Sequence, residues 1–195
     1  MSAGRESRLA LRPMAEADID AVAAIRVRGW QHAYAGLMPQ SYLDAMNVAD
    51  DAARRREHFA RGGADGPVNL VAEDAHSVVG WAAFGTSRED DAQPGDCELY
   101  ALYVRVERIG TGVGRALADA ALSRAAAQGS RRMLLWVLTD NARARRFYER
   151  CGFAPDGSTQ AWSVHGACVP EVRYTRTLGG ADRLPPGART SFGRL

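Results

Sequence analysis

The stretch ELYALYVRVERIGTGVGRAL, Glu98 to Leu117, decides the fold class of this chain. Its apolar first half predicts a long strand over Cys97 to Val106. The glycines at 110, 112 and 114 predict a turn, which is followed by a helix. The apolar face of that helix is formed by Val113, Ala116, Leu117, Ala120 and Ala121.

A glycine-rich turn between a strand and a helix can bind an anion, because backbone N–H groups approach the ligand closely and the helix N-terminus carries partial positive charge. Two familiar nucleotide motifs are excluded. A P-loop needs a lysine, whereas all 25 Lys-plus-Arg residues here are arginine. A dinucleotide fingerprint needs a sixth-position glycine, which is Arg115 or Leu117 in the two frames. For the loop alone, a tight turn without a ligand stays open.

A second segment, LWVLTDNARARRFYERCGF from Leu135 to Phe153, follows the same order of elements. Its start belongs to an apolar strand over 132–138. Asp140 or Asn141 can cap the next helix, and Gly152 ends it. One face of this helix carries Ala144, Phe147, Tyr148 and Cys151.

These two segments resemble motifs A and B of the GNAT acyltransferase superfamily, and residues 11–46 are similar to the first helices of many members. The resemblance covers about residues 8–178, with both motifs in the family's order. It implies an α+β fold with a mixed central sheet of about seven strands and helices on both faces. It also implies that strands four and five are splayed and hold the pantetheine arm of acetyl-CoA between them.

The resemblance further implies a set of cofactor-binding residues. Two positions depart from the family pattern: Ile109 stands where Gln or Arg is usual, and Val106 where a proline is often found. The implied set is Leu102, Val104, Val106, Ile109, Gly110, Thr111, Gly112, Val113, Gly114, Arg115, Asn141, Ala144 and Tyr148.

Transfer of an acyl group from a thioester to an amine needs a base for the amine and an acid for the thiolate. The resemblance implies Tyr148 as the acid and Glu98 as the base. Other members carry a glutamate on strand five, where this chain has Trp136, and others use only water. Candidates for the acceptor pocket are Trp30, Tyr34, Tyr100 and Glu171.

The whole pattern predicts the order β-α-α-β-β-β-α-β-α-β-β. The expected strands cover 8–12, 68–73, 77–86, 97–106, 132–138, 158–164 and 168–177, and the first expected helices cover 18–30, 41–46 and 50–61. We expect one domain over residues 1–178. Residues 179–195, rich in Gly, Pro and Arg, predict a flexible tail.

The composition also limits which classes of binding partner and location are expected. A formal net charge of +2 gives no case for a nucleic-acid partner, and no stretch is apolar enough for a membrane span. Cys97, Cys151 and Cys168 lack CxxC spacing, so neither a disulfide framework nor a metal site is expected. We expect a cytoplasmic monomer or homodimer that acetylates a primary amine of a small molecule or peptide. The alternative is a non-catalytic sensor that binds acyl-CoA.

Overall fold

The computed structural model describes residues 9–60, 66–75 and 77–179 of the 195-residue chain. The predicted tail, residues 179–195, therefore lies outside the described residues apart from Gly179. No helix within the described ranges is long and apolar enough to cross a membrane.

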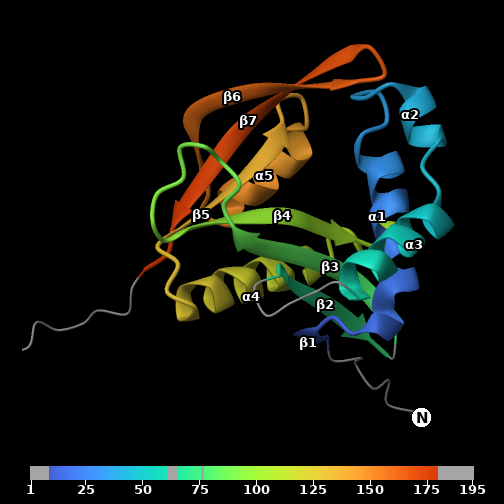
Figure 1. The fold of residues 1–195 in the computed structure, drawn as a ribbon, viewed down its shortest axis with the longest axis horizontal. Coiled ribbons are helices and arrows are strands. Elements are labelled where there is room, and N and C mark those ends of the chain that lie inside the picture. Colours follow the sequence, from blue (N-terminus) through green and yellow to red (C-terminus); the bar gives the residue numbers. More distant parts are fainter. Residues whose placement is uncertain (1–8, 61–65, 76, 180–195) are drawn as a thin grey trace, which may run out of the picture.

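The described residues form one seven-stranded sheet in the order β1-β2-β3-β4-β5-β7-β6 (Figure 1). Every neighbouring pair is antiparallel except β4 and β5, which are parallel. The expected mixed sheet is thus confirmed. The strands are β1 (Ala10–Pro13), β2 (Val68–Asp74), β3 (Ser77–Thr86), β4 (Asp96–Val104), β5 (Arg132–Leu138), β6 (Ala154–Val164) and β7 (Ala167–Thr177).

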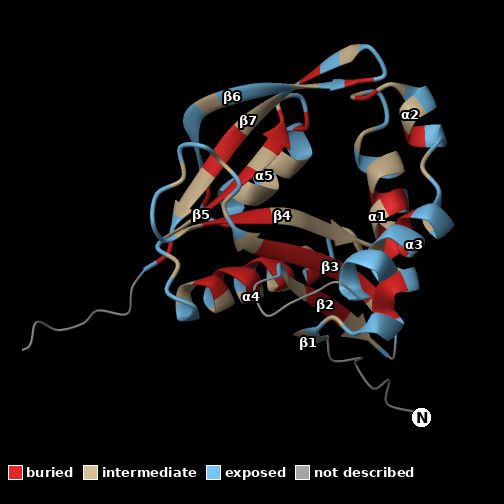
Figure 2. Ribbon diagram, viewed as in Figure 1, coloured by how far each residue is buried: buried red, intermediate tan, exposed pale blue. Residues whose placement is uncertain are grey.

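Helices cover both faces of the sheet. Within the described residues they are α1 (Ile19–Ala33), α2 (Gln40–Asp44), α3 (Val48–Ala60), α4 (Val113–Ala127) and α5 (Ala142–Arg150), with 3-10 turns η1 (Glu16–Asp18) and η2 (Val106–Arg108). Leu117 of α4 packs into the main core with Phe84, whereas Val22 of α1 packs with Trp81 on the opposite face. Figure 2 shows the central strands largely buried between these layers.

The parallel pair β4–β5 is short. It joins Asp96 to Arg132, Cys97 to Met133 and Glu98 to Leu134, and ends there. Beyond that point β4 continues to Val104 against β3, while β5 continues to Leu138 against β7. The two strands therefore part in the middle of the sheet, as the family resemblance implies.

The β6–β7 hairpin extends past the sheet toward α2 (Figure 1). Its residues Trp162 and Val169 pack with Leu43 of α2 and with Trp30 of α1. The rings of Trp30 and Trp162 are 5.9 Å apart at 90°, the edge-to-face arrangement that aromatic pairs favour. This contact ties the last hairpin to the N-terminal helices.

Two predicted boundaries on the strands need correction. β4 ends at Val104 rather than Val106, because Arg108 N–H donates to the Arg105 carbonyl and closes a 3-10 turn there. Val106 therefore lies in η2 and not on the strand. The sixth strand begins at Ala154 instead of Ser158, since the irregular stretch between Pro155 and Thr159 still pairs with β7 at both ends.

Gly80 on β3 is where α4 comes closest to the sheet. A Cβ there would lie 2.8 Å from Leu117 Cδ1 and 2.9 Å from Val113 Cγ1, and both side chains are buried. We expect Gly80→Ala to destabilise the protein by about 1–3 kcal/mol through overpacking. Thermal melting measures this, with Gly179→Ala as the control because a Cβ at Gly179 meets nothing within 4 Å. Equal melting temperatures for the two variants would contradict the close packing.

Candidate active site

A cavity of about 610 Å³ opens where β4 and β5 part. Its lining comes from α1, β4, the glycine loop, the start of α4, β5 and α5. Both predicted motifs thus meet in one space. A second cavity of about 320 Å³ lies near β1 and η2, around the ion pairs of Arg12 with Asp18 and Glu73. Val106 lines this second cavity and not the large one.

One end of the large cavity is formed by the glycine loop and the first turn of α4. Gly110 and Gly112 have φ of +83° and +91°, and a Cβ at either would point into open space. Gly112 caps α4, whose first backbone bond runs from Ala116 N–H to the Gly112 carbonyl at 3.0 Å. The N–H groups of the first turn before Ala116 therefore have no acceptor within the helix.

Arginines also line the cavity: Arg108 and Arg115 flank the glycine loop at this end, and Arg143 and Arg150 come from α5. Arg108 is paired with Asp74, and within the described part of the chain Arg108 Nε and Asp74 Oδ1 are both buried without a hydrogen-bond partner. Arg115 is held by Asp119 at 2.8 Å. Guanidinium groups bind phosphates through charge-assisted hydrogen bonds, so this end suits a phosphate-bearing ligand.

Most of the implied cofactor residues line this cavity. They are Leu102, Val104, Ile109, Gly110, Gly112, Gly114, Arg115, Asn141, Ala144 and Tyr148. Three do not. Val106 has moved into η2, Val113 is buried against Gly80, and the Thr111 hydroxyl donates to the Arg108 carbonyl at 2.7 Å.

The α5 residues at the cavity have distinct settings. Asn141 accepts a hydrogen bond from Ala144 N–H at 3.0 Å through its side chain and so caps the helix, as predicted. The ring of Tyr148 packs edge-on against Phe147 and Phe153. No hydrogen bond to its hydroxyl occurs among the described residues. Burial, and then the neighbouring Tyr103, raises the pKa of Tyr148 well above its usual range, so its proton stays in place.

Glu98 lies outside the cavity, contrary to the expectation of a base there. Its carboxylate is buried, accepts from Arg88 Nη2 at 2.5 Å and Nε at 3.2 Å, and also binds the Arg88 backbone N–H. The position explains this, because Glu98 sits where β4 still pairs with β5, before the strands part. The structure therefore does not bring Glu98 and Tyr148 together.

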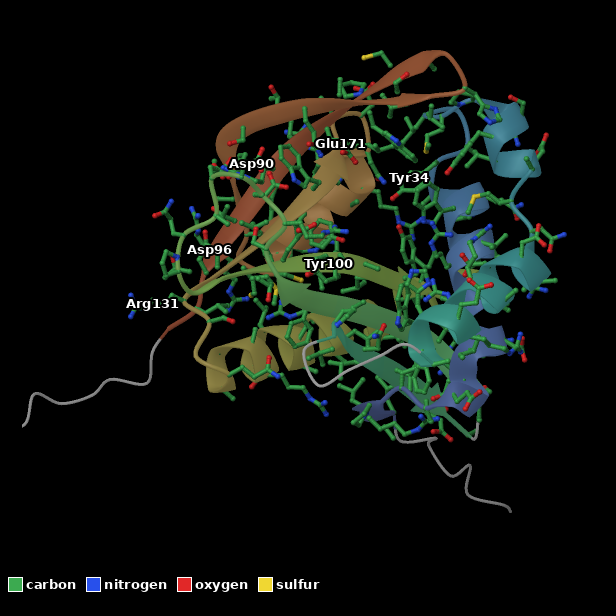
Figure 3. The ribbon with its side chains drawn as sticks, in the orientation of Figure 1. Tyr34, Asp90, Asp96, Tyr100, Arg131 and Glu171 are labelled. Atoms are coloured by element: carbon green, nitrogen blue, oxygen red, sulfur yellow. The ribbon has the colours of Figure 1, made fainter. Side chains whose placement is uncertain are left out.

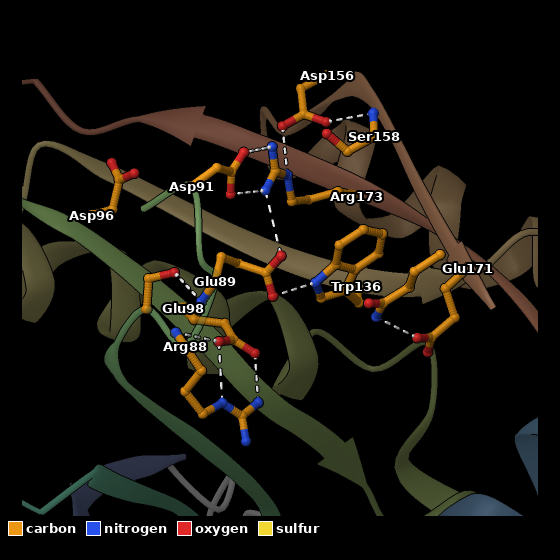
Figure 4. Close-up of polar contacts among 12 residues, drawn as sticks. Arg88, Glu89, Asp91, Asp96, Glu98, Trp136, Asp156, Ser158, Glu171 and Arg173 are labelled. Atoms are coloured by element: carbon orange, nitrogen blue, oxygen red, sulfur yellow. Dashed lines mark hydrogen bonds and ion pairs between the residues drawn. The ribbon is translucent and has the colours of Figure 1, made fainter. Parts of the chain in front are cut away.

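A network around Arg173 fixes the β3–β4 loop beside the cavity (Figure 4). Arg173 binds Asp91 at 2.7 Å, Asp156 at 2.7 Å and Glu89 at 3.5 Å. Glu89 in turn accepts from Trp136 Nε1 at 2.9 Å, and Trp136 lines the cavity. The loop that carries Glu89 is thereby held against β5 and β7.

Aromatic side chains form part of the lining of the cavity. Tyr34 and Tyr100 line it as predicted, whereas Trp30 and Glu171 do not. Tyr100 is the extra residue of a bulge in β4, and its hydroxyl donates to the Thr86 carbonyl. Tyr34 follows the last residue of α1 and Glu171 belongs to β7; both are labelled in Figure 3.

Sequence reasoning missed several lining residues, among them His32, Tyr103, Arg108 and Trp136 as a cavity residue. One signal pointed to Tyr103. Gly29 stands inside α1, and a Cβ there would lie 3.1 Å from Tyr103 Cδ1. A glycine within a helix indicates that another part of the chain packs closely there, but the sequence alone does not identify that part. Among the described residues, no group of His, Cys, Asp or Glu could hold a metal ion.

Gly112 offers a direct test of the anion end. We expect Gly112→Ala to cost about 1–2 kcal/mol in stability, because an L-residue resists positive φ, and also to weaken coenzyme A binding at least about tenfold. Gly129→Ala is the matched control, since Gly129 has φ of +90°, open space around its Cβ and no place in the cavity. Calorimetric titration and melting of both variants measure the two effects. Equal loss of affinity in both would contradict a role for the loop in binding.

Comparison with known proteins agrees with this geometry. The chain is 28% identical to the Mycobacterium tuberculosis protein "Probable N-acetyltransferase Rv2775" over 87% of this chain and 94% of that one. It is 31% identical to "Uncharacterized N-acetyltransferase YuaI" of Bacillus subtilis, over 64% of this chain and 68% of that one. The fold matches the PaiA N-acetyltransferase of Thermoplasma acidophilum, solved with coenzyme A, with a TM-score of 0.67 and 15% identity over 87% and 99% of the two chains.

The family model described as "Acetyltransferase (GNAT) family" matches residues 30–153, which include the diverging strands, the glycine loop and α5. The match covers more than half of the chain and both sides of the cavity. This protein therefore belongs to the GNAT family and is an acetyltransferase.

Proposed function

We propose that this enzyme transfers an acetyl group from acetyl-CoA to a primary amine of a small molecule or peptide, by direct attack with both substrates bound. The observation that carries the proposal is the parting of β4 from β5 beside the N-terminus of α4. An extended pantetheine arm fits along the free edge of β4, and the pyrophosphate fits at the helix end.

The residues present fit the cofactor. The loop at Gly110 and Gly112 leaves a space that a Cβ would fill, and Arg115, in the first turn of the helix that follows, also lines the cavity. In this proposal the first-turn N–H groups of α4 hold the pyrophosphate, while Leu102 and Val104 hold the pantetheine amides. When bound, acetyl-CoA supplies the activated acetyl thioester.

Tyr148 is proposed as the acid that protonates the departing thiolate. It lines the cavity on α5, and burial keeps its pKa high, so the hydroxyl retains its proton at any working pH. A hydroxyl without a partner among the described residues is free to donate to a ligand atom. Tyr34 and Tyr100 also line the cavity and are proposed to border the acceptor.

Acetyl-CoA at ~100 times its dissociation constant should stabilise the protein by about 2.7 kcal/mol and raise its melting temperature by several degrees. NAD or ATP should not. A free-thiol assay with acetyl-CoA and butylamine, putrescine, glycinamide or alanylalanine should then show amine-dependent thiol release. A shift with ATP but none with acetyl-CoA would contradict the proposal, as would binding without thiol release from any amine.

Tyr148→Phe should lower kcat by about 10²–10⁴-fold, since it removes a general acid. It should leave acetyl-CoA affinity nearly unchanged, because ring packing against Phe147 and Phe153 survives. The matched control is Tyr42→Phe, whose ring lies in the α2 aromatic cluster and outside the cavity. Measurement of kcat, acetyl-CoA affinity and melting temperature on both variants distinguishes a catalytic role of Tyr148 from a structural one. If Tyr148→Phe keeps the kcat of the wild type, Tyr148 is not the acid and another group protonates the thiolate.

A further inference from the structure

Two aromatic residues stand at the point where β4 and β5 part. Glu98 and Leu134 form the last parallel pair of these strands. Tyr100 and Trp136 follow two residues later, one on each strand, and both line the large cavity. The two side chains therefore border the opening of the sheet from its two sides. We refer to Tyr100 and Trp136 as the aromatic pair.

The aromatic pair and the proposed acid belong to opposite faces of the sheet. On β5, Leu135 and Val137 pack into the core under α4, so Trp136 between them points to the other face. Tyr100 packs against the smaller core under α1, on that other face. Tyr148 packs against the α4 core. The cavity thus takes its lining from both faces, which leaves the α1 face for the acceptor.

Arg88 of the β3–β4 loop (87–95) covers one face of the Tyr100 ring. Its guanidinium carbon lies 4.2 Å from the ring centroid, within the range of a cation-π contact. The buried carboxylate of Glu98 accepts hydrogen bonds from two nitrogens of this guanidinium and so fixes its plane. The Tyr100 hydroxyl donates to the Thr86 carbonyl, just before the same loop. The opposite ring face is the one left for a ligand.

Glu89, the next residue of the loop, fixes the other member of the aromatic pair. Its carboxylate accepts a hydrogen bond from Trp136 Nε1 at 2.9 Å. Arg173, the partner of Trp136 across β5 and β7, has its guanidinium carbon 5.8 Å from the centroid of the Trp136 ring. Arg173 also binds Glu89, at 3.5 Å (Figure 4). The indole is therefore held by its N–H and at one of its faces.

These contacts favour a planar acceptor group. Because protein groups already hold both rings, little conformational freedom is lost when a ligand packs against them. An aromatic ring that stacks on another ring, or meets it edge-on, gains energy beyond the burial of its surface. A saturated group of the same size gains only the burial. The aromatic pair therefore distinguishes the two kinds of group.

We propose that Tyr100 and Trp136 determine the specificity of the acceptor subsite, which takes a primary amine that carries an aromatic ring, and that Glu89 is the positioning residue that holds Trp136. The inference rests on the proposed acetyl transfer and names the class of its acceptor. The ring of the acceptor lies at the aromatic pair on the α1 face. Its amine extends through the opening between β4 and β5 toward Tyr148.

The test compares phenethylamine with cyclohexylethylamine, which have the same carbon skeleton, in the free-thiol assay at saturating acetyl-CoA. In the wild type, the KM of phenethylamine should be about 5–10-fold lower than that of cyclohexylethylamine. Trp136→Leu should make the two KM values equal, because it removes one ring of the pair. The KM of acetyl-CoA should stay at the wild-type value, since the pair lies on the other face of the sheet from α4.

Glu89 is tested as a positioning residue by two substitutions. Glu89→Ala removes the acceptor of the Trp136 hydrogen bond and should raise the KM of phenethylamine about 3–10-fold, with kcat unchanged. Glu89→Gln should restore the KM, because its amide oxygen can accept the same hydrogen bond. The matched control is Asp90→Ala at the exposed next position, labelled in Figure 3. A merely structural role of Glu89 would lower the melting temperature and leave the ratio of the two KM values unchanged.

The outcomes separate this inference from the proposed function. An active wild type with equal KM values for the two amines, or with a lower one for cyclohexylethylamine, would overturn the aromatic subsite alone. So would a folded Trp136→Leu variant that keeps the wild-type ratio. If Trp136→Leu does not fold, an unchanged ratio in Glu89→Ala overturns the proposal. Equal loss of the ratio in Glu89→Gln and Glu89→Ala would contradict the positioning role of the hydrogen bond. No thiol release from any amine would overturn the proposed acetyl transfer, and the subsite with it.

Discussion

The three-residue parallel pairing of β4 with β5 is the constraint on which the site depends. A central strand normally satisfies its backbone N–H and C=O groups on both edges, because leaving them unpaired in the interior is costly. From Tyr100 to Val104, β4 has β3 on one edge and the cavity on the other. The second half of β4 therefore has a free backbone edge inside the sheet. This edge faces the cavity, which the glycine loop and α5 also line. Longer pairing of β4 with β5 would remove that edge.

Sequence reasoning succeeded where the determinant is local. Glycines with positive φ at 110 and 112, the cap at Asn141 and the helix face with Tyr148 depend on neighbours within a few residues. Each of these features carries its own signal in the chain. These local signals were sufficient to predict the glycine turn and the capped helix that border the cavity, whereas the fold was predicted from the resemblance of the two segments to the family motifs.

The predictions that differ from the structure depend on contacts that no local pattern records. Glu98 was expected in the cavity, but its carboxylate is bound by Arg88 from a polar loop with no periodicity. Tyr103 reaches the cavity through a gap at Gly29, which lies far away in the sequence. Val106 was expected on the strand, yet one 3-10 hydrogen bond turns the chain away after Val104. Each of these differences concerns either a contact with a residue outside the local pattern or the end of a strand that is misplaced by two residues.

The position of β7 has a consequence for synthesis on the ribosome. β7 is the last strand to be made, yet it lies between β5 and β6 in the sheet. Its Arg173 also gathers Asp91 and Asp156 from segments made earlier. While the chain is emerging, β5 has an unpaired edge and these carboxylates lack their shared cation. The residues that line the cavity all precede β6 in the chain, whereas β5 gains β7 as its neighbour only after Thr177 has left the exit tunnel, so the lining is synthesised before the strand that completes the sheet behind it.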